Sequence, residues 1–517
     1  MISYADRGLE KQRYKGWYGD MEHKVGLSKS RYCSAVQCPK TLWLSVHKPE
    51  LMGSAGAESV LTNGTIVGEV ARGYFGEYAL VPYSGNKQQM VEDTIRLMES
   101  GVETIAEGSI VYDGLYCAVD LLHKNGDGWD IVEVKSSTSV TETYLEDMAF
   151  QYYVLKNAGV PVKDVYMLYI NNKYVRHGEL NLKELFILEK HTEDAVNREA
   201  QVGKNIAEFR EYASQEQEPE KDIDLCCEVP YECAYKAYCR RNLPMPSIFD
   251  VAGLTDKKAY QFYHSGIKSF EDIIEKKVKL TERQLLQVER AVNHLPAIIH
   301  KDKIQEFLST LRYPLYYLDF ETFQQAIPEF EGGRPYEQIP FQYSLHVEYE
   351  DGRLEHLEFL AKEGTDPRRA VAERLCEDIP MGACSLAYNM SFEKGRIKTF
   401  AEQYPDLAEH LMDIHDHMVD LEVVFAARDY YNNAMKGKST IKLVLPALYP
   451  DDPELDYHNL EDVHNGGEAS AAFLTMADKS PEEIARLREN LLKYCGLDTY
   501  AMVKLIWKLR EAVKDNN

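Results

Sequence analysis

The sequence predicts an α/β protein with more than one domain. At 517 residues the chain is too long for one ordinary domain, since roughly 150 residues per domain is typical. Its composition, 44% hydrophobic and 28% charged residues, is that of a globular chain that can bury large cores. Short apolar strands followed by amphipathic helical segments occur early and late in the chain, and this order predicts α/β architecture in each part.

Charge and targeting signals narrow the class of protein. A formal net charge of −25 argues against a broad basic surface of the kind that binds nucleic acid. Residues 1–20 are charged and contain no apolar segment, and no uninterrupted apolar run approaches a membrane span. We therefore expect a cytoplasmic, soluble protein that has no secretory signal and does not enter a membrane. Residues 1–27 are expected to be an N-terminal extension.

The first strands with chemical interest form a predicted hairpin. Residues 114–123 read as a strand and residues 129–135 as its return, joined by a turn rich in Asn, Gly and Asp. Asp120 lies near the end of the first strand. Glu133 and Lys135 share one face of the second strand, because side chains alternate along a strand.

A predicted helix over residues 142–158, ended by Gly159, carries Asp147 and Gln151. An aspartate, then E-x-K, then a helix with a glutamine resembles the PD-(D/E)XK nucleases of the RecB type. The resemblance departs at Leu155, where relatives often have a tyrosine. An E-x-K motif alone would carry no weight.

This resemblance implies a metal site and a role for each motif residue. Asp120 and Glu133 would hold the metal, with the carbonyl of Val134 as a further ligand. Lys135 would position the attacking water and offset charge on the phosphate. Residues 63–71 suit the first helix of the family. In the family, this helix supplies another acid or a histidine to the site. Glu69 is the candidate there, and an exposed helical glutamate is the alternative.

Six of the ten cysteines form two clusters. Clustered cysteines in a chain without export signals are more often metal ligands than disulfides. Cys38, which precedes a proline and a helical stretch, is the expected fourth ligand, with Cys33 and Cys226 as alternatives. Spacing alone leaves zinc and an iron-sulfur cluster open. The other three ligands repeat with five residues between neighbours: Cys227, Cys233 and Cys239.

One early and three late cysteines around this core resemble the subset that includes the CRISPR-associated RecB-like nucleases and the AddB helicase-nuclease subunit. The resemblance implies a [4Fe-4S] cluster held by the four thiolates. It also implies a restriction-endonuclease-like domain over residues 28–245. Residues 246–305 are expected to form a helical linker to the second domain.

A buried strand is predicted over residues 317–323, in which Asp319 and Glu321 emerge on one face. Residues 334–343 read as an extended segment and a second strand beside it. Three later segments add polar groups. Glu393 follows a short strand at the start of a helix, Asp420 stands in an apolar bracket, and Tyr494 and Asp498 share a helical face four residues apart.

D-x-E, then N-x-x-F-E, then Y-x-x-x-D resembles the DnaQ-like 3′–5′ exonucleases of the RNase H-like fold, in the variant with a tyrosine in the last motif. The resemblance covers about residues 313–512 and implies an exonuclease domain over residues 306–517. Phosphodiester hydrolysis by two Mg²⁺ or Mn²⁺ ions needs hard oxygen ligands around both ions. Tyr494 would orient or deprotonate the water. The ions would be held by Asp319, Glu321, Glu393 and Asp498.

Two features leave the exonuclease site open. An aspartate is usual where this chain has Glu393, so the metal position can be shifted. Lys436, Lys438 and Lys442 flank Gly437 and are candidates for binding the nucleic-acid backbone. A solvated loop explains these lysines equally well.

Together the motifs predict a metal-dependent nuclease with two active sites, acting on DNA ends or single strands. Taken whole, the chain resembles a bacterial family of two-part proteins that joins a cysteine-framed nuclease to an RNase H-like domain. One alternative is an RNA exonuclease, because the RNase H-like fold serves both sugars. Another is a nucleic-acid-binding scaffold in a defence or repair complex with partner proteins, in which one or both sites are inactive. The sequence leaves the oligomeric state open.

Overall fold

The computed structural model describes residues 25–53, 58–455, 460 and 462–514. It is a mixed α/β protein whose internal contacts divide the chain into two compact units. The first unit runs to residue 242 and includes residues 325–336, and the second comprises residues 243–324 and 337–517. Of the expected N-terminal extension, only residues 25–27 are described.

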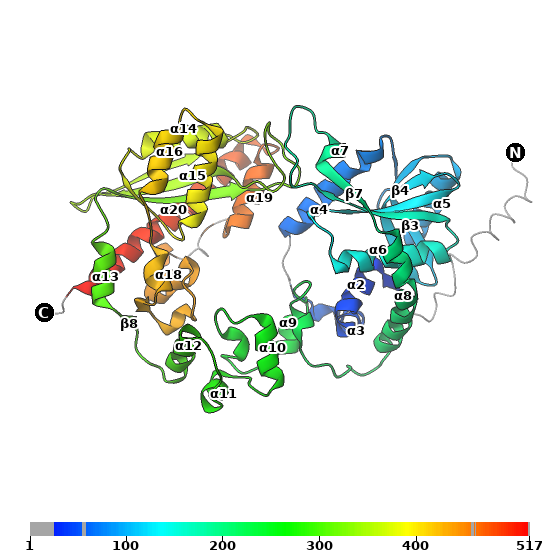
Figure 1. Ribbon diagram of the computed structural model, residues 1–517, viewed down its shortest axis with the longest axis horizontal. Helices are drawn as coiled ribbons and strands as arrows, with labels where there is room; N and C mark the ends of the chain where they lie inside the picture. The colour runs from blue at the N-terminus through cyan, green and yellow to red at the C-terminus, as the bar shows by residue number, and fades with distance from the viewer. Residues whose placement is uncertain (1–24, 54–57, 456–459, 461, 515–517) are drawn as a thin grey trace, which may run out of the picture. The chain divides into compact units, whose positions relative to one another are not determined.

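The first unit is built on a seven-stranded sheet in the order β2-β3-β4-β5-β6-β7, with β1 paired to β4 (Figure 1). The hairpin predicted around residue 126 is confirmed, since β4 and β5 pair antiparallel. β5 and β6 run parallel and are joined by helix α6, the usual crossover for parallel neighbours. The strands are β1 Leu27–Ser28, β2 Ala79–Leu80, β3 Thr104–Tyr112, β4 Leu115–Asn125, β5 Gly128–Lys135, β6 Val162–Ile170 and β7 Phe186–Lys190.

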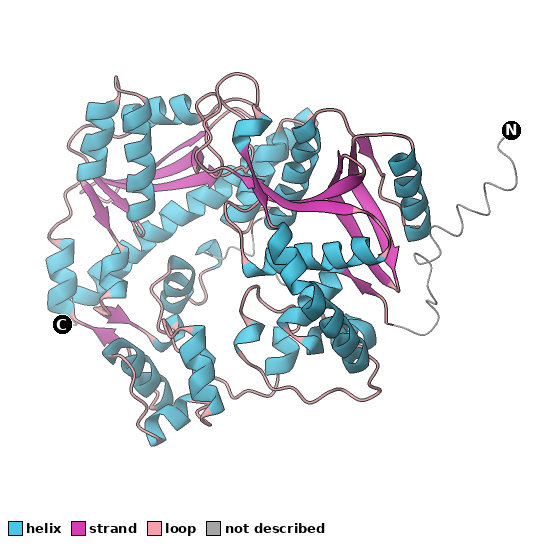
Figure 2. Ribbon diagram, turned by 45° about the vertical axis from the view of Figure 1, so that its right-hand side comes forward, coloured by secondary structure: helices cyan, strands magenta, loops and turns pink. Residues whose placement is uncertain are grey.

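Helices cover both faces of this sheet (Figure 2). Side chains alternate along β5, so Ile131 packs into the core under α6 and α8, and Val132 into the core under α4. Glu133 therefore emerges on the α6 side of the sheet. The helices are α2 Lys29–Gln37, α3 Pro39–His47, α4 Glu58–Ala71, α5 Lys87–Glu99, α6 Glu142–Asn157, α7 Leu182–Leu185, α8 Thr192–Ala213 and α9 Lys236–Arg240.

The second unit has a five-stranded sheet in the order β11-β10-β9-β12-β13. β9, β10 and β11 are antiparallel, so the strand predicted beside residues 317–323 is confirmed as β10. β12 and β13 run parallel to β9. The strands are β9 Leu315–Phe323, β10 Ile339–Glu348, β11 Leu354–Leu360, β12 Cys384–Ala387 and β13 Met418–Asp420.

Two helical layers sandwich this sheet. α14 (Arg368–Asp378), α15 (Ser391–Gln403) and α16 (Ala408–Asp416) pack on one face, and α20 (Pro481–Val513) packs on the other (Figure 1). Tyr343 and Leu345 on β10 enter the core under the three helices. Ser344 and His346 alternate with them and bond to Thr499 of α20. Polar side chains therefore face α20, and the catalytic candidates of β9 share that face.

Shorter helices complete the second unit. The segment expected as a linker packs within it, since Gln287 of α12 donates to the carbonyl of Lys436 at 3.2 Å. β8 (Ile298–Ile299) in the same segment pairs with β14 (Tyr430–Tyr431). The helices are α10 Asp256–His264, α11 Phe270–Glu275, α12 Glu282–Val292, α13 Lys301–Leu308, α17 Glu422–Ala426, α18 Ile441–Leu448 and α19 Gly466–Met476.

The connection from β9 to β10 packs on the first unit. The amide of Arg176 donates to the carbonyl of Gly333 at 3.0 Å, and the amide of Gly332 donates to the carbonyl of Arg176 at 2.8 Å. Ala326 is buried in the core under α4. Residues 325–336 are therefore a structural part of the first unit.

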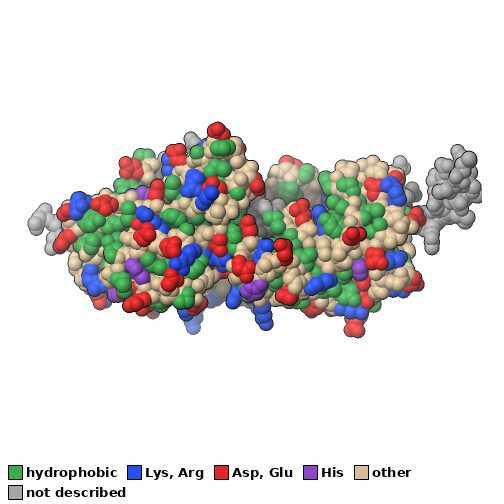
Figure 3. All heavy atoms as spheres, turned by 90° about the horizontal axis from the view of Figure 1, so that it is seen from above, with side chains coloured by type: hydrophobic (Ala, Val, Ile, Leu, Met, Phe, Trp, Pro, Cys, Tyr) green, Lys and Arg blue, Asp and Glu red, His purple; other side chains and the backbone are tan. Residues whose placement is uncertain are grey.

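Surface charge and helix character complete the description. On the face seen in Figure 3, acidic side chains are interspersed with Lys and Arg rather than gathered in one patch. Among the described helices, none combines the length and the apolar character needed to cross a membrane.

Candidate functional site

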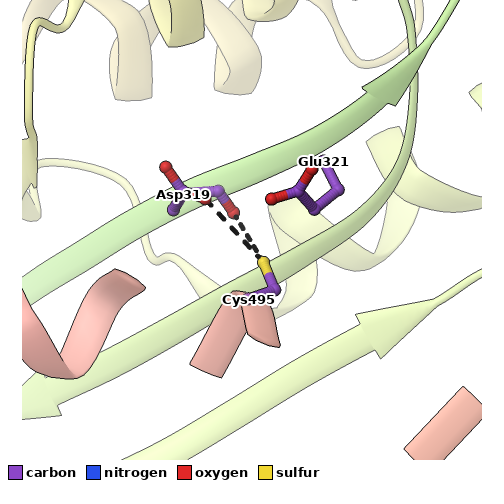
Figure 4. A group of neighbouring side chains, drawn as sticks. All are labelled: Asp319, Glu321 and Cys495. Carbon is purple, nitrogen blue, oxygen red and sulfur yellow. Dashed lines mark hydrogen bonds between the residues drawn. The ribbon is translucent and has the colours of Figure 1, made fainter. Parts of the chain in front are cut away.

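The most compact ligand group lies on the sheet of the second unit, under α20. Ligand atoms of Asp319, Glu321 and Cys495 all lie within 4.8 Å of one another (Figure 4). The Cys495 thiol points at Asp319, with 3.9 Å from Sγ to Oδ2. No other set of three His, Cys, Asp or Glu side chains in the described ranges is as tightly grouped. β9 supplies the two acids on alternate residues, as predicted.

Asp498 and Glu393 join these two acids. Burial raises the pKa of Asp319 well above its ordinary range, and the charges of Asp498, Glu321 and Glu393 raise it further. Burial and the charge of Asp498 raise the pKa of Glu321 to about 8. Like charges that share a buried site disfavour ionisation of one another. The charges of the other three predicted carboxylates therefore reach Asp319 from β9, α15 and α20, and two of the four, Asp319 and Glu321, belong to the compact group.

Glu393 lies in the first turn of α15 and is 4% exposed. Burial and the charge of Asp420 raise its pKa to about 7, although its own backbone amide has the opposite effect. Its Oε2 atom is buried and has no hydrogen-bond partner among the described residues. A buried carboxylate oxygen without a partner costs free energy, and a cation would satisfy it. The donor set therefore fits hard divalent ions such as Mg²⁺ or Mn²⁺.

Tyr494 stands one turn before Asp498 on α20. Burial raises the pKa of this phenol far above its usual range, and the charges of Asp498 and Glu321 act in the same direction. The phenol is therefore a neutral hydrogen-bond donor. Of its two predicted roles, this state suits orienting a water better than deprotonating it.

The three candidate lysines differ in their relation to this cluster. Lys442, on α18, lies near enough for its charge to lower the pKa of Glu321 against the effect of burial. Lys436 and Lys438 are exposed, and no described contact joins them to the four carboxylates. Gly466 at the start of α19 also approaches the cluster, since a Cβ added there would lie 3.5 Å from Oε2 of Glu321.

A second charged cluster lies in the first unit, between β5, α6 and α2. Glu133 accepts from Lys135 Nζ at 2.6 Å and from Lys29 Nζ at 2.8 Å, both at Oε1. Gln151 Nε2 donates to Oε2 of Glu133 at 2.6 Å. Lys135 also donates to Asp147 at 2.8 Å. Burial alone would raise the pKa of Glu133, but the charges of Lys135 and Lys29 hold it below its ordinary value.

Two further carboxylates share this cluster. Asp120 accepts from the amide of Val134 at 2.7 Å, so the described contact of Val134 is made by its N–H, and its carbonyl remains a predicted ligand. Burial and the charge of Glu133 raise the pKa of Asp120 to about 7. They also raise the pKa of Asp147. Three carboxylates thus share two lysines, and the buried Oε1 of Gln151 has no partner among the described groups.

Sequence reasoning missed Lys29, which lies 104 positions from Glu133. A local signal was present. Ser28 caps α2, and its hydroxyl accepts from the amide of Arg31, so Lys29 is the first helical residue. A cation there opposes the helix dipole and needs a compensating partner. Glu69, the predicted ligand from α4, is exposed and makes none of the described contacts with this cluster.

The predicted thiolate ligands gather in another part of the first unit. Cys38 is the N-cap residue of α3, and the Cys226 thiol lies within hydrogen-bonding reach of the Cys38 thiol. Burial raises the pKa of Cys233 to about 11, with contributions from the charges of Cys227, Cys38 and Cys239. Thiols that raise one another's pKa values are a natural site for a metal or cluster, which replaces their protons. Among the described residues, however, no three of these thiols bring their sulfur atoms within 4.8 Å of one another.

The two alternative ligands differ. Cys226 lies beside Cys38 and belongs to the same neighbourhood. Cys33 lies instead beside the charged cluster, where burial raises its pKa and the charges of Asp147 and Lys29 act on it. The structure therefore favours Cys226 over Cys33 as the alternative fourth ligand.

The comparisons with known proteins give similarity without a described activity. A family model described as "Domain of unknown function (DUF2779)" matches residues 316–440, which contain Asp319, Glu321 and Glu393. "Uncharacterized protein MG366" of Mycoplasma genitalium is 26% identical over 238 residues, covering 42% of this chain and 35% of that protein. Its homolog in Mycoplasma pneumoniae is 28% identical over 238 residues with the same coverage. This chain thus spans about a third of the length of the curated relatives it matches, and it is similar over part of its length to proteins with no described function.

Proposed function

We propose that this protein is a metal-dependent nuclease whose second unit is a DnaQ-like 3′–5′ exonuclease of the RNase H-like type acting on DNA. The observation that carries the proposal is the group of four carboxylates on β9, α15 and α20, of which Glu321 and Glu393 are buried and whose charges act on one another. Such a group is costly to bury without cations. Mg²⁺ or Mn²⁺ ions would neutralise it and supply Lewis-acid activation of the phosphate and of a water nucleophile.

The chain's own residues have separate tasks in this reaction. The carboxylates Asp319, Glu321, Glu393 and Asp498 hold the ions. Tyr494, as a neutral phenol, donates a hydrogen bond that orients the attacking water. Lys442 brings a positive charge close to Glu321. There it would offset the negative charge of the phosphate backbone of a bound strand. The N-terminus of α19 at Gly466 adds backbone amides that favour an anion.

We propose a second hydrolytic site in the first unit, of the RecB-like PD-(D/E)XK type with a [4Fe-4S] cluster. The network of Glu133, Lys135 and Gln151 supports it, because a lysine beside two acids can hold a water and stabilise charge on the phosphate. Asp120 and Glu133 would hold the metal there. The RNA-directed and scaffold alternatives remain distinct outcomes of the test.

The test uses end-labelled single- and double-stranded DNA and RNA, incubated with Mg²⁺ or Mn²⁺. In a Lys135→Ala background, Asp319→Asn should remove stepwise degradation from 3′ ends by at least about a hundredfold, because one of the ion-holding groups is lost. Asp478→Asn changes an exposed acid of the same unit and should leave the rate unchanged. Glu133→Gln in an Asp319→Asn background tests the first unit in the same way.

Three outcomes would contradict the proposal. Unchanged 3′-end degradation in the Asp319→Asn, Lys135→Ala double variant would overturn the exonuclease assignment. Binding of DNA with no metal-dependent cleavage by the unaltered protein would favour the scaffold. Cleavage of RNA with no cleavage of DNA would transfer the same chemistry to the RNA exonuclease.

A further inference from the structure

A cavity of 590 Å³ adjoins Lys135 in the first unit. Its lining begins at Ser136, the next residue in the chain, and includes Tyr144 and Tyr336. Lys135 Nζ lies 5.1 Å from the centre of the Tyr144 ring, so the proposed hydrolytic site and the cavity share a wall. The volume lies within the range of roughly 300–1,000 Å³ that is typical of ligand sites.

One side of the cavity consists of four consecutive hydroxyl residues, 136–139. The backbone of this run is fixed, because the amide of Ile170 donates to the carbonyl of Ser137 at 3.0 Å. The hydroxyl of Ser137 donates to the carbonyl of Ser139. The hydroxyls of Thr138 and Ser139 are exposed, and within the described ranges no hydrogen bond to them is seen. Hydroxyl donors in a fixed run are suited to phosphate and sugar oxygens.

Two tyrosines, Tyr144 and Tyr336, form the aromatic side, and Tyr231 lies beside Tyr144. The hydroxyls of Tyr144 and Tyr231 lie within hydrogen-bonding reach of each other. Burial raises the pKa of Tyr231, and the charge of Lys135 lowers it. Tyr336 is close enough for the charge of Tyr144 to add to the rise in its pKa caused by burial. Tyr231 is 54% exposed. Unpaired bases stack on aromatic side chains of this kind, whereas bases inside a duplex have no free face.

Tyr336 comes from the segment between β9 and β10 and is held in place by three features. Its hydroxyl donates to the carbonyl of Ser136, and its amide donates to the carbonyl of Gln325 at 2.7 Å. Its φ of 60° is in the left-handed region, which a bulky side chain adopts only when its surroundings enforce it. The connection between β9 and β10 therefore places an aromatic ring in the wall of the cavity.

We infer that this cavity binds one nucleotide of a single strand, next to the phosphate at which the first unit would act. The base stacks on Tyr144 and Tyr336, and the sugar and phosphate face residues 136–139. The inference rests on the proposed hydrolytic function of the first unit and adds its substrate class. Single strands are the substrate because only an unpaired base has a free face that can stack on the tyrosine rings.

The test is photo-crosslinking of the full chain in chelator, where no cleavage occurs. The probes are single-stranded oligonucleotides that carry one 4-thio-2′-deoxyuridine or, in the second arm, one 4-thiouridine. We expect mass spectrometry to map the crosslinks to peptides that contain Tyr144, Tyr231 or Tyr336. The two arms compare the deoxyribose and ribose forms of the same ligand, and a duplex probe should crosslink at least about tenfold less.

Variants sharpen the result. Tyr336→Ala should lower the yield at Tyr144 by about tenfold or more, since one of the two rings on which the base stacks is lost. Tyr336→Phe keeps the ring, loses only the hydrogen bond to Ser136, and should retain most of the yield. Tyr83→Ala, which alters a tyrosine of the same unit that is 91% exposed, should leave the yield unchanged.

Crosslinks confined to residues 243–324 and 337–517 would overturn the inference, as would a yield at Tyr144 that is equal in Tyr336→Ala and the unaltered protein. Because the readout needs no catalysis, it is separate from the proposed function. Crosslinks at these tyrosines in a protein that never cleaves would sustain the nucleotide site and refute the hydrolytic one. Cleavage lost in Glu133→Gln, with no crosslinks here, would do the reverse.

Discussion

At the scale of single residues, each candidate site contains neighbouring carboxylates whose negative charges disfavour one another's ionisation. Glu321 shows this most clearly, because burial and the charge of Asp498 move its pKa from 4.5 to about 8. An acid with a raised pKa in the folded state binds its proton more tightly when folded. Its contribution to stability is complete below pH 4.5 and is lost as the pH rises through 8.

The first prediction follows from this sign. In chelator, the unaltered protein should lose stability relative to Glu321→Gln between pH 4.5 and 8, by on the order of a few kcal/mol. Denaturant unfolding at several pH values, with hydrogen exchange in β9 as the local readout, measures the difference. Mg²⁺ or Mn²⁺ should remove it by neutralising the carboxylates.

Glu402→Gln, which alters an exposed acid of the same unit, is the control for loss of a charge and should follow the unaltered protein. Parallel pH profiles for Glu321→Gln and the unaltered protein would show that Glu321 is ionised at no cost. The four carboxylates would then lack the mutual repulsion on which the proposed metal site depends.

At the scale of elements, α2 is tied to the sheet through its first residue. Lys29 is 22% exposed at its side chain and lies 2.8 Å from Glu133 and 3.5 Å from Asp147. Its removal would leave three carboxylates with one lysine. Breaking a buried ion pair by removing one partner typically costs several kcal/mol.

The second prediction is that Lys29→Met destabilises the first unit by on the order of 2–4 kcal/mol in chelator. Hydrogen exchange in α2 and β5 is the measurement. Divalent ions should restore part of the loss, because a cation would replace the missing charge. Lys87→Met is a matched control, since Lys87 is the first residue of α5 and is exposed. Equal protection in Lys29→Met and Lys87→Met would show that Lys29 does not hold the cluster together.

Local patterns could predict the strands that carry the acids. The β4–β5 hairpin is specified by alternation and by its turn, and β9 by an apolar run with acids on one face. The helical face predicted for Tyr494 and Asp498 belongs to α20, which begins much earlier, at Pro481. Its capping box, in which Ser480 and Glu483 satisfy each other's backbone amides, was a local signal for that start.

Contacts between distant segments could not be predicted in this way. Nothing in the sequence around residues 325–336 shows that the connection after β9 packs with the first unit, or that Tyr336 meets Ser136. Likewise, the capping serine before Lys29 marks a helix start but does not identify Glu133 as its partner. Secondary structure follows from neighbours in sequence, whereas these contacts depend on how sheets and helices pack.

At the scale of the whole molecule, each unit has its own buried core. Tyr32, Phe150 and Ile131 belong to the core of the first unit, and Tyr317 and Leu345 to cores of the second. Loss of structure in one unit should therefore leave the other folded. The thiol group that contains Cys38 and Cys233 lies entirely in the first unit.

The last prediction uses this separation. A cluster that joins Cys38 to Cys227 would close a loop of 189 positions (227 minus 38). By analogy with a disulfide, closing so long a loop stabilises the folded state by on the order of 5 kcal/mol. The full chain, purified without oxygen, should contain about four iron and four sulfide per chain.

Cys233→Ala should lose the iron and the hydrogen-exchange protection of α2, α3 and α9, while β9, β10 and β11 stay protected. Cys376→Ala, in the second unit, should keep both iron and protection. Stoichiometric zinc without iron would replace the cluster by a zinc site on the same thiolates. Full iron in Cys38→Ala, combined with loss of iron in Cys226→Ala, would make Cys226 the fourth ligand, as its position beside Cys38 allows. Iron retained in Cys233→Ala would contradict the predicted ligand set, because Cys233 would then not be one of the iron ligands.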